Sequence, residues 1–159
     1  MNVYFSDRDS LRLYRRDGHL NLQMRAIYAG GDIEGESFWF ILDTGAFLTV
    51  ISRIRAEQFG FDKLPKIASK IKGFTGETPA DFVRIPSLKI IDKLITDVPV
   101  LIPHKRDLEQ NILGLNILEY FNYYIDTEND RMYLNLNPNP RHYDPILACG
   151  QVFTIQAGE

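Results

Sequence analysis

The chain has few of the features that mark membrane, secreted or disulfide-rich proteins. Cys149 is its only cysteine, so no intrachain disulfide can form, which is typical of proteins that fold in a reducing compartment. No apolar run reaches the length of a membrane span, and residues 1–20 carry charges throughout, without the apolar core of a signal peptide. We therefore expect a cytoplasmic protein that makes no membrane contact.

The chain also has no large excess of positive or negative charge. The formal net charge is −3 over 159 residues, and the two signs are interspersed. The one short basic cluster, formed by Arg12, Arg15 and Arg16, reads as a solvated face, because no basic stripe continues from it. The composition therefore predicts no nucleic-acid partner.

Side-chain sets for metal, thiol or phosphate chemistry are equally sparse. His19, His104 and His142 are far apart and have no cysteine or carboxylate at ligand spacing. Cys149 has no histidine in a recognisable nucleophile motif, and no glycine-rich loop follows a strand and opens a helix. We expect neither a metal site nor a cofactor.

The most informative stretch that is present is an apolar strand over residues 37–42 that runs into Asp43-Thr44-Gly45-Ala46. Burial penalises the charged form of a carboxylate, so Asp43 needs hydrogen bonds or a functional reason to persist there. The Thr44 hydroxyl and the Gly45 backbone N–H can supply such bonds. Asp-Thr-Gly alone is a common turn sequence, but here apolar residues precede it and the β-prone residues 48–51 follow it.

Two later segments complete an ordered pattern with this loop. Gly73 and Gly76 bracket Phe74 and Thr75 at the tip of an expected hairpin, and Ile112-Leu113-Gly114 ends a short apolar strand. Alone, the first would be a plain surface hairpin and the second an ordinary core strand. In this order the three segments resemble the retropepsin-like, retroviral-type family of single-domain aspartic peptidases, over roughly residues 20–136.

The resemblance implies a role for each segment. Asp43, Thr44 and Gly45 would form the catalytic loop, and the strand carrying Ile112, Leu113 and Gly114 would cross beneath that loop and support it. The hairpin would be a flap that closes over an extended peptide and excludes water. The residues expected to contact the substrate are Ala46, Gly73, Phe74, Thr75 and Gly76.

Chain length decides how many carboxylates one copy can supply. The chain has a one-domain length and a single Asp-Thr-Gly, whereas aspartic peptidase chemistry needs two carboxylates about 3 Å apart that share one proton. Asp126-Thr127-Glu128 lacks the glycine, and we interpret it as a hairpin turn. The resemblance therefore implies an aspartic endopeptidase that acts on peptides or proteins as a symmetric homodimer.

The sequence departs from the family directly after Ala46. Retroviral members have an aspartate there that contacts the substrate backbone, whereas this chain has Phe47. Phe47 could line a pocket or fill the core, and we expect the core. The departure leaves open an alternative function, a retropepsin-fold module with weak or no catalysis that serves protein binding or dimerisation.

The expected fold is all-β, a small closed acid-protease barrel with a flap hairpin and one or two short helices. Residues 1–136 would form the peptidase domain. Helices are predicted at residues 53–59, between Ser52 as N-cap and Gly60 as stop, and at residues 115–121. Strands are predicted at residues 20–28, 37–42, 67–72, 77–85, 87–91, 98–102, 122–126 and 131–136.

Residues 137–159 have a different character, with Pro138, Pro140 and Pro145 close together. We interpret this stretch as a C-terminal extension. In retropepsin dimers interleaved terminal strands hold the two copies together, which makes residues 151–155 or residues 2–5 candidates for a dimer-interface strand. A disordered tail is the competing interpretation.

Overall fold

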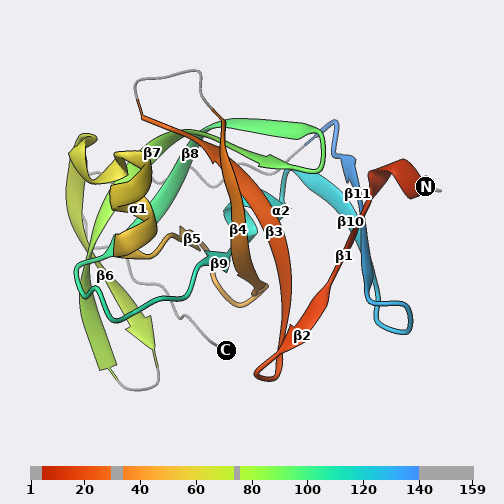
Figure 1. Cartoon of the computed structure of the whole chain (residues 1–159), viewed down its shortest axis with the longest axis horizontal. Helices are drawn as coiled ribbons and strands as arrows, with labels where there is room; N and C mark the ends of the chain where they lie inside the picture. The colour runs from red at the N-terminus through yellow and green to blue at the C-terminus, as the bar shows by residue number, and fades with distance from the viewer. Residues whose placement is uncertain (1–4, 30–33, 74–75, 140–159) are drawn as a thin grey trace.

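The computed structural model describes residues 5–29, 34–73 and 76–139. Within these ranges the chain is mostly β-structure with two short α-helices (Figure 1). The helices are α1 (Arg53–Phe59) and α2 (Leu115–Leu118), and 3-10 turns lie at Asp7–Asp9 and Phe61–Lys63. The strands are β1 (Ser10–Arg12), β2 (Tyr14–Arg16), β3 (His19–Ile27), β4 (Glu34–Leu42), β5 (Thr49–Val50), β6 (Lys66–Gly73), β7 (Gly76–Ile90), β8 (Lys93–Pro103), β9 (Ile112–Leu113), β10 (Phe121–Asp126) and β11 (Arg131–Leu136).

Six of these strands close into a barrel in the order β3-β4-β9-β5-β8-β7. The closing pair is β3 with β7, where Arg25 lies opposite Lys89 and Ala26 opposite Leu88. Beyond the barrel, β2 continues the sheet next to β3, and β6 continues it next to β7. The closed barrel with a hairpin and two short helices that the sequence predicts is confirmed.

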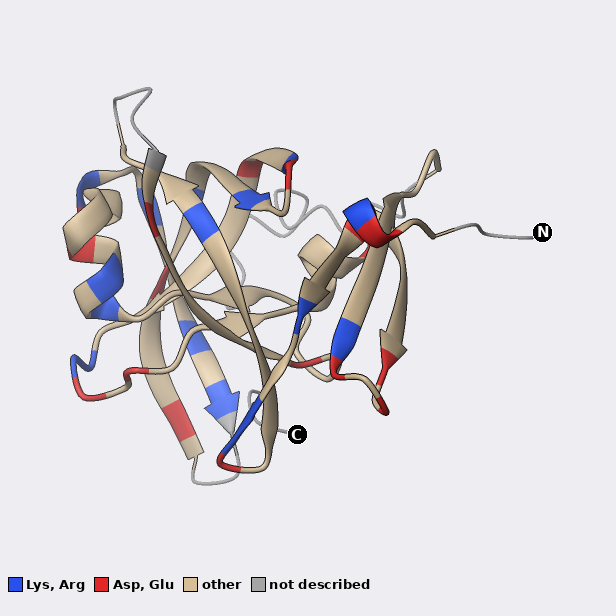
Figure 2. Cartoon of the chain, turned by 45° about the vertical axis from the view of Figure 1, so that its right-hand side comes forward, with Lys and Arg blue, Asp and Glu red and all other residues tan. Residues whose placement is uncertain are grey.

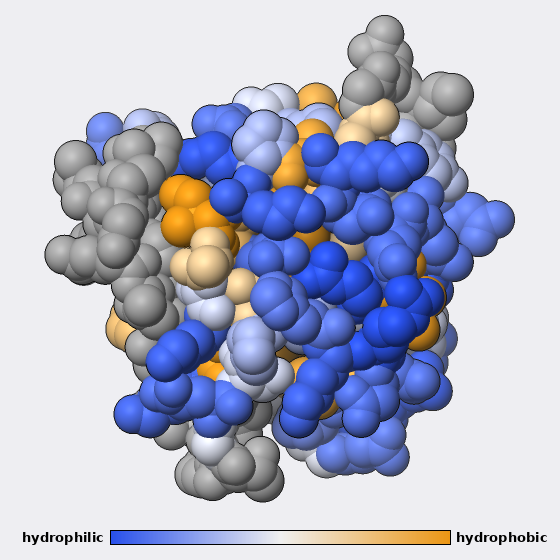
Figure 3. Space-filling view, turned by 90° about the vertical axis from the view of Figure 1, so that its left-hand side faces the viewer, coloured by the Kyte–Doolittle hydropathy of each residue, from blue (hydrophilic) through white to orange (hydrophobic). Residues whose placement is uncertain are grey.

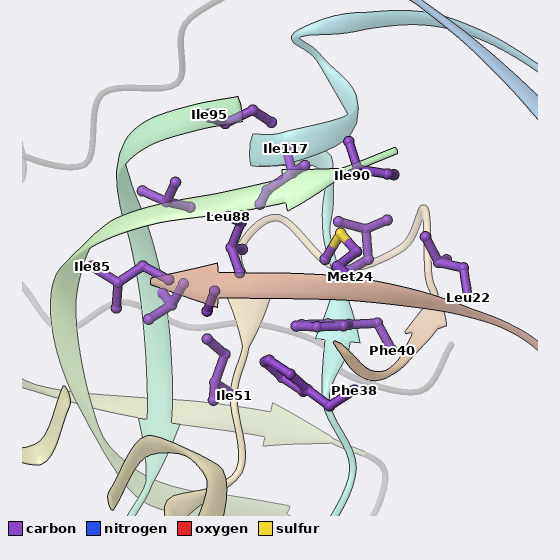
Figure 4. Packing of buried hydrophobic residues seen from close by; sticks show 14 of the residues in the cluster. Leu22, Met24, Phe38, Phe40, Ile51, Ile85, Leu88, Ile90, Ile95 and Ile117 are labelled. Atoms are coloured by element: carbon purple, nitrogen blue, oxygen red, sulfur yellow. The ribbon is translucent and has the colours of Figure 1, made fainter. Parts of the chain in front are cut away.

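The barrel encloses a continuous apolar core, which Figure 4 shows in close-up. It forms because side chains alternate along each strand: in β3 Leu22 and Met24 are buried, whereas Gln23 between them is exposed. The rings of Phe38 and Phe40 on the adjacent β4 pack against each other in a tilted arrangement, with 4.7 Å between their centroids. Each such fully buried side chain contributes about 1.5–3 kcal/mol relative to exposure.

Helix α1 has the boundaries that its capping residues predict. The Ser52 side chain accepts a hydrogen bond from Arg55 N, and Gly60 ends the helix with a left-handed φ of 78°. The helix buries Ala56 and Phe59 against the barrel. Helix α2 is shorter than predicted and ends at Leu118, because Phe121 already begins β10.

Strand β7 corrects the sequence prediction of two separate strands divided at Pro86. It is continuous over Gly76–Ile90 because Pro86 lies where it needs no hydrogen-bond donor. The pairing of β7 with β6 ends at Val83, and the pairing with β3 begins only at Leu88, so β7 pairs there with β8 alone. A proline is tolerated where one side of a strand is unpaired.

A second sheet of three strands, in the order β1-β11-β10, stands beside the barrel (Figure 1). The β10–β11 hairpin is confirmed, including the turn at Asp126-Thr127-Glu128. The Asp126 carboxylate accepts hydrogen bonds from the backbone N–H of Glu128 and of Asn129, both at 3.1 Å. Strands β1 and β2 were not predicted, because three-residue strands carry too little alternation to detect.

The two candidate dimer-interface strands lie almost entirely outside the described residues. Of residues 2–5 only Phe5 is described, and its ring lies 6.2 Å from that of Tyr133. Residues 151–155 fall outside the described ranges, as does most of the proposed C-terminal extension. No helix within those ranges is long and apolar enough to cross a membrane.

Candidate active site

Strand β4 ends at Leu42, and the next residue, Asp43, is buried in the candidate site. Parallel pairing with β9 sets Ile41 opposite Ile112 and Leu42 opposite Leu113, and Asp43 N donates to Leu113 O at 3.1 Å. Asp43 is 6% exposed, and its Oδ1 accepts a hydrogen bond from Gly45 N at 2.9 Å. That bond is available because the loop turns back directly after the carboxylate, as the Thr-Gly sequence predicts.

Strand β9 is inserted between the two strands that flank the Asp43 loop. It lies parallel to β4 and antiparallel to β5, where Ile112 is opposite Val50. The side chains of Ile112 and Leu113 are buried. The structure therefore places the Ile-Leu-Gly segment directly beside the Asp43 loop, in the position predicted for a supporting strand.

Gly114 follows β9 at a point where only glycine fits. A Cβ atom built there would lie 2.7 Å from the backbone carbon of Leu48, 2.8 Å from its oxygen and 3.0 Å from Ala46 O. All three contacts are with backbone atoms of the Asp43 loop, which cannot rotate away as a side chain can. Leu115 N adds a hydrogen bond to Ala46 O at 2.8 Å, so loop and strand end are in direct contact.

The side chain of Asn116 fixes the far half of the same loop. Its Oδ1 accepts hydrogen bonds from Thr49 N at 2.8 Å and from Thr49 Oγ1 at 2.9 Å, and its Nδ2 donates to Pro99 O at 2.8 Å. The Thr49 hydroxyl in turn accepts from Gly114 N at 3.1 Å. Asn116 N donates to Phe47 O at 3.0 Å. A buried amide with all these partners holds its neighbours in one arrangement.

The side chain of Asn111 also holds backbone groups by hydrogen bonds, at the other end of β9. Its Oδ1 accepts a hydrogen bond from Ser52 N at 2.8 Å, and its Nδ2 donates to Trp39 O at 3.0 Å. Neither Asn111 nor Asn116 was predicted from the sequence as part of the site. The sequence does contain a pattern that could have indicated them. Two asparagines lie on either side of an apolar segment that must be buried, and a buried amide requires hydrogen-bond partners.

Phe47 corrects another prediction, because it is not a core residue. It is 58% exposed, whereas its neighbours Ala46 and Leu48 are fully buried. The chain bends at residues 47–48, and the burial of both neighbouring side chains leaves the Phe47 ring on the outside of the loop. An exposed aromatic side chain therefore lies at the edge of the Asp43 loop.

The hairpin β6–β7 extends from Lys66 opposite Val83 to Gly73 opposite Gly76. Phe74 and Thr75, the expected flap tip, lie outside the described residues. A second apolar cluster joins the hairpin to the Asp43 loop, because it contains side chains of both. Its members are Ala46, Leu48, Val50, Ile71, Ala80, Phe82, Leu101 and Ile112. The structure thus brings the hairpin and the loop onto one shared core.

An ion-pair cluster ties β7 to the start of α1. Arg53 donates to Asp81 Oδ2 at 2.9 Å and to Pro103 O at 2.9 Å, and His104 Nε2 lies 2.8 Å from Asp81 Oδ1. Burial raises the pKa of the Asp81 carboxyl, but hydrogen bonds from His104 and Arg53 outweigh burial, and the pKa lies below its ordinary value.

Over residues 5–29, 34–73 and 76–139, no cluster of three or more histidine, cysteine, aspartate or glutamate side chains could hold a metal ion.

The closed barrel, the Asp-Thr-Gly loop and the inserted strand beside it define an acid-protease fold. Residues 29–117, more than half of the chain, match the Aspartyl protease family, and the chain belongs to that family. A retropepsin-like aspartic protease from Rickettsia conorii has a similar structure, with a TM-score of 0.58 and 22% sequence identity. The match covers 80% of this chain and 91% of that one, and at this identity it shows the shared fold alone. No curated protein matches the sequence.

Proposed function

We propose that the protein is an aspartic endopeptidase whose two catalytic carboxylates are Asp43 of one copy and Asp43 of a second copy. The observation that carries the proposal is a buried Asp43 at the end of β4, in a loop held from both sides by β9, Asn111 and Asn116. Membership of the Aspartyl protease family supports it.

The homodimer follows from the count of usable carboxylates. The chain contains one Asp-Thr-Gly, and the nearest imitation, Asp126, uses its carboxylate to close the β10–β11 turn. A second catalytic carboxylate must therefore come from another copy, and two identical residues can meet only on a two-fold axis. Thr44 and Gly45 are exposed beside Asp43, on the side of the loop that a second copy could approach.

The pair of carboxylates would act as base and acid at once. Two like charges at about 3 Å cannot both ionise, so the pair holds one proton. The ionised member takes a proton from a water molecule as the water oxygen attacks the scissile carbonyl carbon, and the other gives its proton to the carbonyl oxygen. The gem-diol then collapses, the C–N bond breaks, and a proton passes to the leaving nitrogen, which yields a carboxylic acid and an amine.

The surrounding residues would keep that pair in place. The hydrogen bond from Gly45 N orients the Asp43 carboxylate, and the Thr44 hydroxyl would bond across the two-fold axis. Residues 73–76 and Ala46 would hold an extended peptide by backbone hydrogen bonds, as in strand addition. Because the loop is fixed before the substrate arrives, little reorganisation is needed during the reaction.

Phe47 favours one alternative function. An exposed aromatic residue stands where retroviral members have an aspartate that contacts the substrate backbone. A groove without that contact could bind a protein segment without cutting it, which would make the chain a dimeric binding module.

Incubation with a diverse peptide library, from about pH 4 to pH 7, separates the two functions because a dyad with one shared proton works in this range. The wild type is compared with Asp43→Asn, which keeps the size of the side chain, and with Asp92→Asn, which changes an exposed carboxylate elsewhere. Cleavage by the wild type and Asp92→Asn but not by Asp43→Asn supports the peptidase. A folded, dimeric wild type that leaves every peptide intact supports the binding module.

A further inference from the structure

A cavity between the three-stranded sheet and the barrel has no role in the proposed reaction. It lies where β1 and the chain leading into β2 meet the outer side of β3, β4 and the end of β7. We call it the inter-sheet cavity, and it is bounded by Arg12, Gln23, Arg25, Ser37 and Lys89. Its volume of about 450 Å³ lies within the range of sites that bind small organic molecules.

The charged side chains that line the inter-sheet cavity are all positive. They are Arg12, Arg25 and Lys89, and no acidic residue is among the described residues that line it. Asp9 lies close by in the chain, but its Oδ1 accepts a hydrogen bond from Lys93 Nζ at 2.7 Å. Figure 2 shows positive residues in blue on β1, β3 and β7, three of the strands that border the cavity. The cavity therefore favours a negatively charged ligand.

Strand register sets like charges opposite each other at two points around this cavity. Arg25 lies opposite Lys89 in the β3–β7 pair, and Arg12 lies opposite Arg131 in the β1–β11 pair. Directly opposite residues of an antiparallel pair have Cβ atoms about 4.5–5.5 Å apart, and like charges there destabilise the sheet. An anion bound between such residues offsets the repulsion, because each cation then has an opposite charge beside it.

Cations on another face of the molecule are arranged differently. The face formed by α1 and the β6–β7 hairpin is mostly hydrophilic (Figure 3), and its cations have acidic partners. The pairs there are Arg53 with Asp81, Lys70 with Glu77 and Arg106 with Glu57. Arg12, by contrast, forms no ion pair with any residue that the structure describes, and its guanidinium carbon lies 4.9 Å from the centroid of the Tyr14 ring. Its charge is therefore available to a ligand.

Neutral side chains add hydrogen-bond donors and apolar surface to the inter-sheet cavity. Ser37 lies opposite Arg25 in the β3–β4 pair, and Gln23 precedes Arg25 on the same face of β3. Within the described ranges neither the Ser37 hydroxyl nor the Gln23 amide makes a hydrogen bond to another residue. Leu11 and Ile91, which are partly buried against the core, also line the cavity. A ligand with a small carbon skeleton suits this lining better than a bare inorganic ion.

We propose that the inter-sheet cavity binds a small organic anion that carries two or more negatively charged oxygen groups, either carboxylates or phosphates. Arg12, Arg25 and Lys89 bind these groups, since a guanidinium donates two parallel hydrogen bonds to a carboxylate or a phosphate. Ser37 and Gln23 donate further hydrogen bonds. The inference goes beyond the proposed function and does not depend on it, because none of the described lining residues belongs to the Asp43 loop.

Isothermal titration calorimetry at constant ionic strength tests the proposal with citrate as the carboxylate probe and inorganic pyrophosphate as the phosphate probe. We expect saturable binding of at least one probe to the wild type, with one site per chain. Arg12→Gln should weaken that binding at least tenfold, because it removes a charged donor from the cavity. Arg12 is exposed, so the variant should keep its fold.

Arg16→Gln is the matched control. Arg16 is also exposed, and its guanidinium carbon lies 5.9 Å from the centroid of the Trp39 ring, but it does not line the cavity. The control removes the same charge and a similar ring contact, so it should weaken binding less than twofold. Equal weakening by the two variants would show that the anions respond only to overall charge, and it would overturn the proposal. The absence of binding of both probes to the wild type would overturn it as well.

The two probes also separate the two possible sources of the anion. Binding of citrate alone assigns the site to carboxylates, and binding of pyrophosphate alone assigns it to phosphates. Comparable binding of both, with the same dependence on Arg12, means that the spacing of negative charges is what the cavity recognises.

A second variant places a negative charge inside the cavity. Gln23→Glu keeps the size of an exposed side chain, and its carboxylate should weaken anion binding at least tenfold by repulsion. Gln110→Glu, at an exposed position away from the cavity, should leave binding unchanged. Equal affinities of Gln23→Glu and the wild type would contradict the proposal.

Thermal unfolding gives a readout on the wild type that needs no variant. A ligand that binds only the folded state raises the melting temperature as its concentration rises. The probe that binds should therefore raise the melting temperature more than sodium chloride of the same ionic strength does, and equal shifts would count against the site. Asp43→Asn should show the same shift as the wild type, so loss of peptidase activity and loss of this site are distinguishable.

Discussion

The Asp43 loop and the β6–β7 hairpin share one apolar cluster, but different forces hold them. Buried side-chain amides bind the loop backbone, and Gly114 lies against it without space for a methyl group. The hairpin beyond that cluster depends on cross-strand backbone pairing and on the exposed ion pair of Lys70 with Glu77. Segments with few buried contacts open locally at low cost, whereas buried networks do not. The comparison indicates that the Asp43 loop is held more firmly than the part of the hairpin beyond the shared cluster.

Gly114→Ala should have the largest effect, because the added methyl group has no space beside the Asp43 loop. The added methyl group would meet backbone atoms of Leu48 at 2.7 Å and 2.8 Å, so the Asp43 loop must shift. We expect a loss of about 3 kcal/mol in the free energy of unfolding. Urea denaturation measures it, and peptide cleavage should be lost as well.

Gly18→Ala is the control for that substitution. Gly18 has a φ of 79°, but no heavy atom lies within 4 Å of the place that an alanine methyl group would take. Alanine there therefore costs only backbone strain, about 1 kcal/mol. Equal losses for the two variants would mean that the close approach of Gly114 to the loop is unimportant.

Asn116→Ala should come next, because it leaves buried polar groups without a partner. Thr49 N and Pro99 O both lose their hydrogen bond to the Asn116 side chain. The expected loss is about 2–3 kcal/mol in the free energy of unfolding. Peptide cleavage should fall more than stability alone explains, because the loop is no longer fixed. Asn129→Ala, in the exposed β10–β11 turn, should cost less than about 1 kcal/mol by the same measurement.

Asp81→Asn tests the junction between the hairpin and the rigid part of the molecule. Because the folded state lowers the pKa of Asp81, the charged carboxylate stabilises the fold above its ordinary pKa, near 3.8, and that contribution disappears as the pH falls through the lowered value. The variant should be less stable than the wild type by about 1 kcal/mol at neutral pH. Urea unfolding at several pH values should show the two proteins converging in acid. A constant difference down to the lowest pH would contradict this account.

Lys70→Ala should have the smallest effect, because it removes an ion pair in which both side chains are nearly half exposed. Such pairs contribute about 0–0.5 kcal/mol. We expect an unchanged melting temperature and slightly faster amide exchange in residues 70–77. A large loss of stability would mean that the hairpin is held as firmly as the loop.

The sequence predicted those parts of the fold whose causes are local. Helix α1 lies between Ser52 and Gly60 because a capping hydroxyl and a left-handed glycine act within one turn. The β10–β11 hairpin was predicted from alternation and a polar turn. The Asp43 loop and its contact with Ile112 were expected from a resemblance to a family, since no local rule brings such distant residues together.

The remaining features depend on contacts between distant segments. Pro86 interrupts any local strand pattern, and only the positions of β3 and β6 explain why β7 continues through it. Phe47 was assigned to the core by its hydrophobicity, whereas its orientation follows from the burial of both neighbours. The roles of Asn111 and Asn116 depend on partners in β4, β5 and β8 that a sequence pattern does not identify.

The insertion of β9 between β4 and β5 also determines when the site can exist during synthesis of the chain. On the ribosome the segment with Asp43 emerges early, but Gly114 and Asn116, which shape its loop, emerge much later. Pairing that spans such a separation is slow and must await the late residues. A nascent chain that stops before Asn116 therefore carries the Asp-Thr-Gly sequence without its geometry, which delays any proteolytic activity at least until residue 116 has been synthesised.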